Sequence, residues 1–125
     1  MNDIINPLVS EEVLGWTREV RQNNPEGHPY YANYWVDRDG NTTKPVNFWS
    51  PATDMKDAME VVEYLRKMDI LIVIETQTGN FKSLYNGNIG AYSKSASLAI
   101  CIAALKSVGV DIADTYSEVK ENKVW

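Results

Sequence analysis

Apolar residues in the middle of the chain recur with the 3.6-residue period of a helix. They stand at positions i, i+3, i+4, i+7 and i+10, namely Met55, Ala58, Met59, Val62 and Leu65. This spacing places them on one helix face, with most of the charged residues off it. Ser50-Pro51 is a typical helix entry, and Asp54 is a second candidate for the N-cap. The pattern predicts an amphipathic helix that begins at one of these positions and continues to Leu65.

Two further segments carry helical signals. Residues Leu8 to Gln22 contain Ser10 as a candidate N-cap, with acidic residues directly after it, which predicts a short helix. Ser95 to Val108 predicts another helix, with Gly109 as its C-terminal stop. Small or apolar residues cover most of this last segment. We therefore expect it to pack on two sides, against a sheet and against another helix or subunit.

Strand signals begin with a predicted hairpin that is rich in aromatic residues. Its two strands, Tyr30 to Val36 and Thr42 to Trp49, flank the turn signal Asp39-Gly40. Pro45 makes the second strand either short or an edge strand, because proline cannot donate to a strand ladder.

A second group of strands follows the central helix. Ile70 to Ile74 is a continuous apolar run, typical of a central strand that is covered on both faces. Phe81 to Tyr85 and Ile89 to Tyr92 are predicted to follow it as antiparallel strands, with a turn at Asn86-Gly87. The elements together predict an α+β fold, in which helices sandwich a mainly antiparallel sheet.

Length and composition are those of one globular domain. The chain has 125 residues, 44% hydrophobic and 23% charged, so we expect a single domain over residues 1–125, with its core in 10–109 and a tail or oligomer arm in 110–125. No apolar run reaches the roughly 18 to 20 residues that span a bilayer. The single cysteine, Cys101, fits a reducing compartment. A cytoplasmic location is the expectation.

Net charge narrows the possible partners. The formal charge of −5 disfavours attraction to DNA, RNA or anionic lipid. A small anionic ligand stays possible, since a pocket needs only two or three convergent cations and backbone N–H groups.

Three stretches in order carry a resemblance to a known family. They are Val13-Leu14-Gly15-Trp16, Asn47-Phe48-Trp49-Ser50-Pro51-Ala52-Thr53-Asp54 with the helix that follows, and Ser97-Leu98-Ala99-Ile100-Cys101-Ile102-Ala103-Ala104-Leu105. They resemble the early Val-Met-Gly-Trp, the Ser-Pro-Ser-Thr-Asp turn and the terminal helix of the phage ABA sandwich domain family. Ile102 departs from the Arg that relatives often carry there. The resemblance implies a phage or prophage origin and a helix, sheet, helix sandwich.

The sequence contains few residues that could act in catalysis or bind a metal. The only histidine, His28, lies in a predicted loop, and Cys101 lies on an apolar helix face, so neither a nucleophile–base pair nor a zinc ligand set is indicated. Asp37 to Asn41 fails the calcium-loop pattern and is better explained as a hairpin turn. Glu60 and Glu63 are one helical turn apart and are expected to be a solvated, charge-paired face. We therefore expect a protein that is not an enzyme and needs no cofactor.

Aromatic residues are the most unusual feature, with four Trp, seven Tyr and two Phe. Tyr30, Tyr31, Tyr34 and Trp35 cannot all point inward from one strand, because side chains alternate. Some rings are then expected at a contact, where they could stack on a base or close a dimer. The candidate ligand-binding residues combine rings, cations and one turn amide: Trp16, Arg18, Arg21, Trp49, Phe81, Lys82, Asn86 and Tyr92. For Asn86 a turn-forming role is the competing interpretation.

The functional hypothesis from the sequence rests partly on analogy. Small phage proteins of this size and layering include oligomeric sponges that capture nucleotide-derived signals of bacterial immunity. By that analogy the chain would be a homo-oligomer that sequesters a cyclic ADP-ribose isomer or a cyclic oligonucleotide and so inhibits anti-phage defence. The alternative is a phage structural or interaction protein that binds another protein through its aromatic hairpin and its last helix.

Overall fold

The computed structural model describes residues 2–23 and 30–110. The expected tail therefore lies outside the described residues apart from Val110, and so does His28. Along the chain the elements are α1 (Asn2–Leu8), η1 (Val9–Val13), β1 (Thr17–Asn23), β2 (Tyr30–Val36), β3 (Thr42–Pro45), η3 (Val46–Phe48), α2 (Met55–Arg66), β4 (Ile72–Gln77), β5 (Asn80–Tyr85), β6 (Asn88–Ser93) and α3 (Ala96–Ser107).

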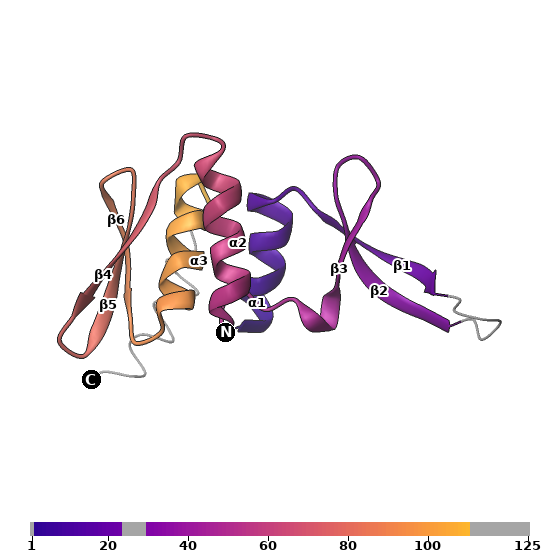
Figure 1. Ribbon diagram of the computed structural model, residues 1–125, viewed down its shortest axis with the longest axis horizontal. Helices are drawn as coiled ribbons and strands as arrows, with labels where there is room; N and C mark the ends of the chain where they lie inside the picture. Colours follow the sequence, from indigo (N-terminus) through magenta and orange to yellow (C-terminus); the bar gives the residue numbers. More distant parts are fainter. Residues whose placement is uncertain (1, 24–29, 111–125) are drawn as a thin grey trace.

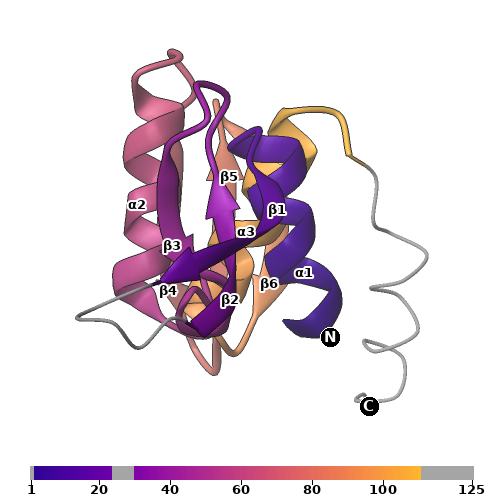
Figure 2. The same ribbon diagram turned by 90° about the vertical axis from the view of Figure 1, so that its right-hand side faces the viewer.

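The strands form two antiparallel sheets of three strands each. The first has the order β1-β2-β3 and the second β4-β5-β6. The helices lie between the two sheets, and the molecule is elongated along the line that joins them (Figure 1). Viewed from one end, the first sheet lies in front of α1 and α2 (Figure 2). The α+β class is confirmed, and the strands are divided between two sheets. None of the helices in the described part of the chain is long and apolar enough to span a membrane.

The predicted helix over residues 8–22 is wrong in its second half. The helix begins at Asn2, continues through the π-helical turn η1 and ends before Gly15, whose φ of +73° turns the chain. Ser10 is not a cap, because its Oγ donates to the Asn6 carbonyl one turn earlier, at 3.0 Å. Thr17–Asn23 forms β1, which pairs with β2 along its whole length. This pairing outweighs the weak local helix signal.

The predicted hairpin is confirmed, with a shorter second strand. The Asp37 carboxylate accepts hydrogen bonds from the backbone N–H of Asp39 and of Asn41, both at 2.9 Å, which fixes the turn. β3 ends at Pro45, and η3 follows it. β3 is an edge strand, as the proline predicted.

The central helix is confirmed, but its buried face differs from the predicted one. Asp54 is the N-cap, since its side chain accepts the Lys56 N–H at 2.9 Å. The buried residues are Asp57, Ala58, Val61 and Leu65, whereas Met55 and Met59 are 44% and 49% exposed. The Asp57 carboxylate accepts the Ser50 N–H at 2.9 Å. That hydrogen bond holds Asp57 on the inward face.

The second sheet is covered on one face by α3, and β4 is an edge strand. The prediction of a central strand covered on both faces is therefore wrong, and Val73 of β4 is 50% exposed. The antiparallel partners β5 and β6 are confirmed. α3 approaches β6 closely at Gly90, where a Cβ would lie 2.6 Å from the Cβ of Ala103.

The last helix forms the centre of the core. Ser95 caps α3 by accepting the Leu98 N–H at 3.2 Å, and Gly109, the predicted stop, follows the end of the helix with φ +86°. All residues from Ala99 to Leu105 are buried. The helix contacts the second sheet on one side and α2 and η1 on the other. The expected two-sided packing is thus achieved within one chain.

Candidate functional site

The turn before α2 connects three helices through backbone hydrogen bonds. The Ala52 N–H donates to the Asn6 amide oxygen of α1 at 2.9 Å, and the Ala52 carbonyl accepts from the Ser97 hydroxyl of α3 at 3.0 Å. The Ser50 N–H donates to Asp57 of α2. Ala52 and Trp49 are both 2% exposed. We call this turn, residues 49–54, the hub. Its hydrogen bonds hold the segment η3–Ser50 against α1.

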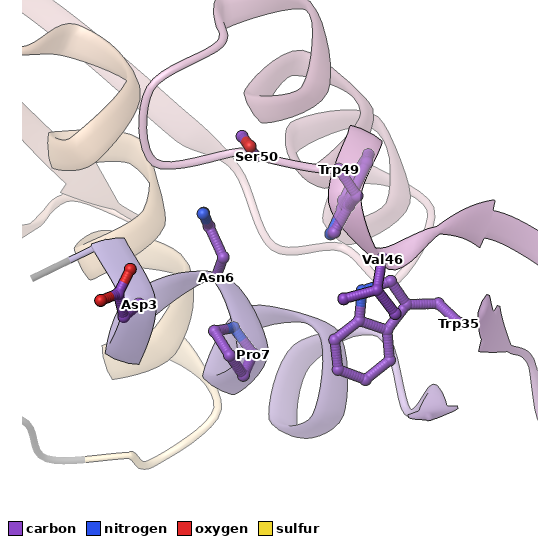
Figure 3. A pocket seen from close by; sticks show the side chains of 7 residues that line it. All are labelled: Asp3, Asn6, Pro7, Trp35, Val46, Trp49 and Ser50. Atoms are coloured by element: carbon purple, nitrogen blue, oxygen red, sulfur yellow. The ribbon is translucent and has the colours of Figure 1, made fainter. Parts of the chain in front are cut away.

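A hollow of about 190 Å³ lies beside this hub. Seven residues line it, from α1, from β2 and from the segment between β3 and α2: Asp3, Asn6, Pro7, Trp35, Val46, Trp49 and Ser50. Trp35, Val46 and Trp49 gather at one end of the hollow, and Asp3 lies at the other, with Asn6 between them (Figure 3). The hollow therefore has an aromatic end and a polar end.

Two tryptophans at the aromatic end are held rigidly. Trp49 donates from Nε1 to the Ser10 hydroxyl at 2.9 Å, and its ring centroid lies 5.1 Å from that of Trp16 at an interplanar angle of 53°. Trp35 is 2% exposed and makes part of the core between the first sheet and the helices. Both rings are therefore held in place by contacts within the single chain.

Two cations lie against the same tryptophans. The Arg18 guanidinium is 5.1 Å from the Trp35 ring centroid, and the Lys44 ammonium is 5.7 Å from that of Trp49. The strand register places Arg18, Trp35 and Lys44 side by side across the first sheet. Lys44 also pairs with Glu60 of α2 at 3.2 Å. Positive charge is thus located next to the aromatic end of the hollow.

Three polar side chains line the hollow. Asp3 supplies a carboxylate, Asn6 an amide and Ser50 a hydroxyl, and the seven lining residues include no histidine, cysteine, lysine or arginine. The only cysteine, Cys101, is fully buried in α3, and burial raises the pKa of its thiol to about 12. Such a thiol stays protonated and unreactive at neutral pH.

The helix carboxylates behave as charged surface groups. Glu63 accepts a hydrogen bond from Arg66 Nε at 3.0 Å, and this bond lowers the pKa of the Glu63 carboxyl. Glu60 pairs with Lys44. The expected charge pairing on this face of α2 is confirmed.

Of the eight predicted ligand-binding residues, four belong to the first sheet and its surroundings. Trp49 lines the hollow, Trp16 packs on Trp49, and Arg18 lies over Trp35. Arg21 points to the opposite face of β1 by strand alternation from Arg18. There its Nη2 contacts Glu19 at 3.0 Å and the Gly40 carbonyl at 3.4 Å.

The other four predicted residues lie on the second sheet, at the far end of the molecule (Figure 1). Lys82 is 3.9 Å from Glu75 and 6.0 Å from the Tyr92 ring centroid. Phe81 is half-buried between Thr76 and Ser93. Asn86 has φ +49°, and its side chain accepts the Leu71 N–H at 2.9 Å. Its turn-forming role is therefore confirmed.

The eight residues do not converge within one chain, and their ligand-binding role stays a prediction. The sequence reasoning did not single out Asn6, Val46 or Lys44 for the hollow. Ser50 had a usable signal, because it stands in the turn motif, whereas Asn6 and Val46 meet at the hollow only in the folded chain.

Comparison with known proteins identifies the family. The model of the phage ABA sandwich domain family matches residues 7–105. The matched span contains the Gly15 turn, the hub around Ser50 and nearly all of α3, so each stretch that carried the resemblance has a structural role in this fold. Searches of curated proteins and of solved structures gave no match. The chain belongs to the phage ABA sandwich domain family.

Proposed function

We propose that this protein of a phage family binds a small nucleotide-derived signal without transforming it, and that the Trp35–Trp49 hollow receives the base. The observation that carries the proposal is the hollow itself, which combines two fixed indole rings with polar groups and adjacent cations.

The size of the hollow favours a single base. Its volume of about 190 Å³ is somewhat larger than the roughly 150 Å³ cavity that takes up one benzene ring. A purine fits this space, while the ribose and phosphates of a nucleotide would remain outside. Stacking on aromatic side chains contributes about 1–3 kcal/mol per base.

The polar side chains at the Asp3 end of the hollow suit the edge of a base, and the cations beside its aromatic end suit phosphate. The Asp3 carboxylate accepts hydrogen bonds, so it suits an exocyclic amino group, and Asn6 and Ser50 can read a ring edge. Lys44 and Arg18 lie within 6 Å of the lining rings, where they would meet phosphate oxygens. Phosphate binding would compete with the Lys44–Glu60 pair, whose side chains are 35% and 45% exposed.

The biological role follows as part of the same proposal. Binding without turnover by a phage-encoded homo-oligomer in the host cytoplasm would deplete a cyclic ADP-ribose isomer or a cyclic oligonucleotide and so inhibit anti-phage defence. The absence of histidine, cysteine and lysine among the seven lining residues supports binding over cleavage. The competing role, a protein-interaction module, loses support from α3, whose apolar surface is already buried within the chain.

A thermal-shift screen tests the proposal. Cyclic ADP-ribose isomers and cyclic di- and trinucleotides are added to the full chain, and a binding ligand raises the melting temperature by mass action. The bound compound is then released by heat and analysed by mass spectrometry. Intact recovery is expected, whereas recovery of a cleaved product would show an enzyme. No shift with any compound in the panel would reject nucleotide binding.

A pair of lysine variants locates the site. Lys44→Gln removes the cation next to Trp49 and should weaken binding about 10-fold, which is the usual effect of one charge-assisted hydrogen bond. Lys56→Gln removes an exposed lysine of α2 as a matched control and should leave affinity unchanged. Equal affinities for both variants would place the phosphate site elsewhere.

A further inference from the structure

The second sheet has one face that α3 covers and one that points away from α3. Ser83 of β5 is fully buried and points toward Gly90 and Ala103, so the side chains that alternate with it, Lys82 and Leu84, point away from α3. Cross-strand pairing adds Val73, Ile89, Glu75 and Tyr92 to the same side. We call this side the outer face. Among the described elements, none packs on it (Figure 1).

Apolar side chains dominate the outer face. Val73, Leu84 and Ile89 form one cross-strand row; Leu71 precedes Val73 by two residues, and Tyr92 pairs with Lys82 in the next row. Leu71 is 56% exposed, Val73 50%, Ile89 51% and Tyr92 41%. These four residues together place exposed apolar surface on one side of the sheet, as interaction sites on soluble proteins do.

The charges of the outer face are balanced. The strands β4, β5 and β6 contain one acidic and one basic residue, Glu75 and Lys82, and these lie 3.9 Å apart. The whole chain carries a net charge of −5, so most of its surface repels a second copy. This face does not, and a two-fold axis through it would place each Glu75 near the Lys82 of the other copy.

From this face we infer that the protein forms a two-fold dimer in which two outer faces stack on each other. Two sheets that stack face to face lie about 10 Å apart and interdigitate their side chains. A stable interface buries roughly 800 Å² per partner and has an apolar centre with a polar rim, and on this face Val73 and Ile89 would form the centre and Glu75 and Lys82 the rim. The dimer would have the layers helix, sheet, sheet, helix at its centre.

This inference is independent of nucleotide binding. The outer face belongs to the second sheet, whereas the Trp35–Trp49 hollow lies between α1 and the first sheet, on the other side of α2 and α3, so the two sites share no residue (Figure 1). If no nucleotide binds, the inference of a dimer still stands. If the protein is a monomer, the proposal of base binding in the hollow still stands.

Sedimentation equilibrium of the full chain tests the dimer. The expected mass is twice the 14.1 kDa of one chain at micromolar concentration. Val73→Lys and Ile89→Lys each place two lysines in the symmetric interface and should weaken association at least 100-fold. Val20→Lys is the matched control, because Val20 is 64% exposed on β1 of the other sheet, and it should remain dimeric.

Folding of the variants is checked separately by circular dichroism in dilute solution, where both forms are monomers. Equal melting temperatures are expected, since the substituted side chains are exposed in the single chain. A wild-type mass of 14.1 kDa up to about 100 µM would overturn the inference. If the protein is a monomer and Val73→Lys lowers its melting temperature, the inference is also overturned, because another segment of the same chain then covers the outer face. An assembly that survives both lysine substitutions would place the interface elsewhere.

Discussion

The contact between α3 and β6 allows one substitution to be predicted in detail. Gly90→Ala adds a single Cβ, which would lie 2.6 Å from the Ala103 Cβ and 2.9 Å from the Ala103 Cα. Carbon atoms in contact normally stand 3.5–4.0 Å apart, so helix and strand must separate by about 1 Å. Ala103 is fully buried in the middle of α3 and has no free space to move into.

The expected loss in the free energy of unfolding follows from overpacking of the core. Inserting a methyl group into a tight core costs about 1–3 kcal/mol, and for a domain of this length that lowers the melting temperature by roughly 3–12 °C. The measurement is urea unfolding of the wild type and the variant, followed by tryptophan fluorescence. A double-mutant cycle with Ala103→Gly adds a second test, because removing the nearer atom should recover part of the loss despite the cost of about 1 kcal/mol for glycine in a helix.

The matched control is Gly79→Ala in the β4–β5 turn. Its φ of +84° makes alanine unfavourable by about 1–2 kcal/mol, but a Cβ there would meet nothing within 4 Å. Combined with Ala103→Gly, its effect should be additive. The packing argument is refuted if Gly90→Ala is neutral, or if its effect simply adds to that of Ala103→Gly.

Three further predictions concern the hub, the helix cap and the thiol. Trp49→Phe removes the hydrogen bond to the buried Ser10 hydroxyl and should cost about 1–3 kcal/mol in urea unfolding, with little further loss when Ser10→Ala is added; a full second loss would contradict this coupling. Asp54→Ala removes the α2 cap and should cost about 1 kcal/mol, and an unchanged melting temperature would show that the cap is dispensable. Burial raises the pKa of Cys101 from 9.0 to about 12, so its contribution to stability is complete below pH 9 and is lost as the pH rises toward 12. The thiol should react with an aromatic disulfide reagent only after unfolding, and rapid reaction of the folded chain would contradict its burial.

The parts of the fold that the sequence predicted are those with strong local signals. α3 has an N-cap serine, a long apolar run and a glycine stop, and each feature acts within a few residues of the others. The pairs β2–β3 and β5–β6 are joined by short turns with Asp-Gly and Asn-Gly, which fix the pairing locally. Such elements need no distant contact to be recognised.

The missed features depend on contacts between distant segments. β1 carries charged residues on both faces, and only its pairing with β2 makes it a strand. The burial of Asp57 on α2 depends on its hydrogen bond from the Ser50 N–H, which no apolar period indicates. The hollow likewise brings Asn6, Trp35 and Trp49 together from separate elements, so no sequence spacing indicates it.

The most direct test of the central claim is a nucleotide titration observed through the tryptophan indole N–H signals in ¹H–¹⁵N NMR spectra. The chain has four tryptophans, and single Trp→Phe variants assign their four signals. If a base stacks in the hollow, its ring current should shift the indole signals of Trp35 and Trp49 in proportion to occupancy, for a cyclic ADP-ribose isomer or a cyclic oligonucleotide. Unchanged indole signals of Trp35 and Trp49 at saturating ligand, with or without shifts in the backbone amide signals of Lys82 and Tyr92 on the second sheet, would contradict the assignment of this hollow as the ligand site.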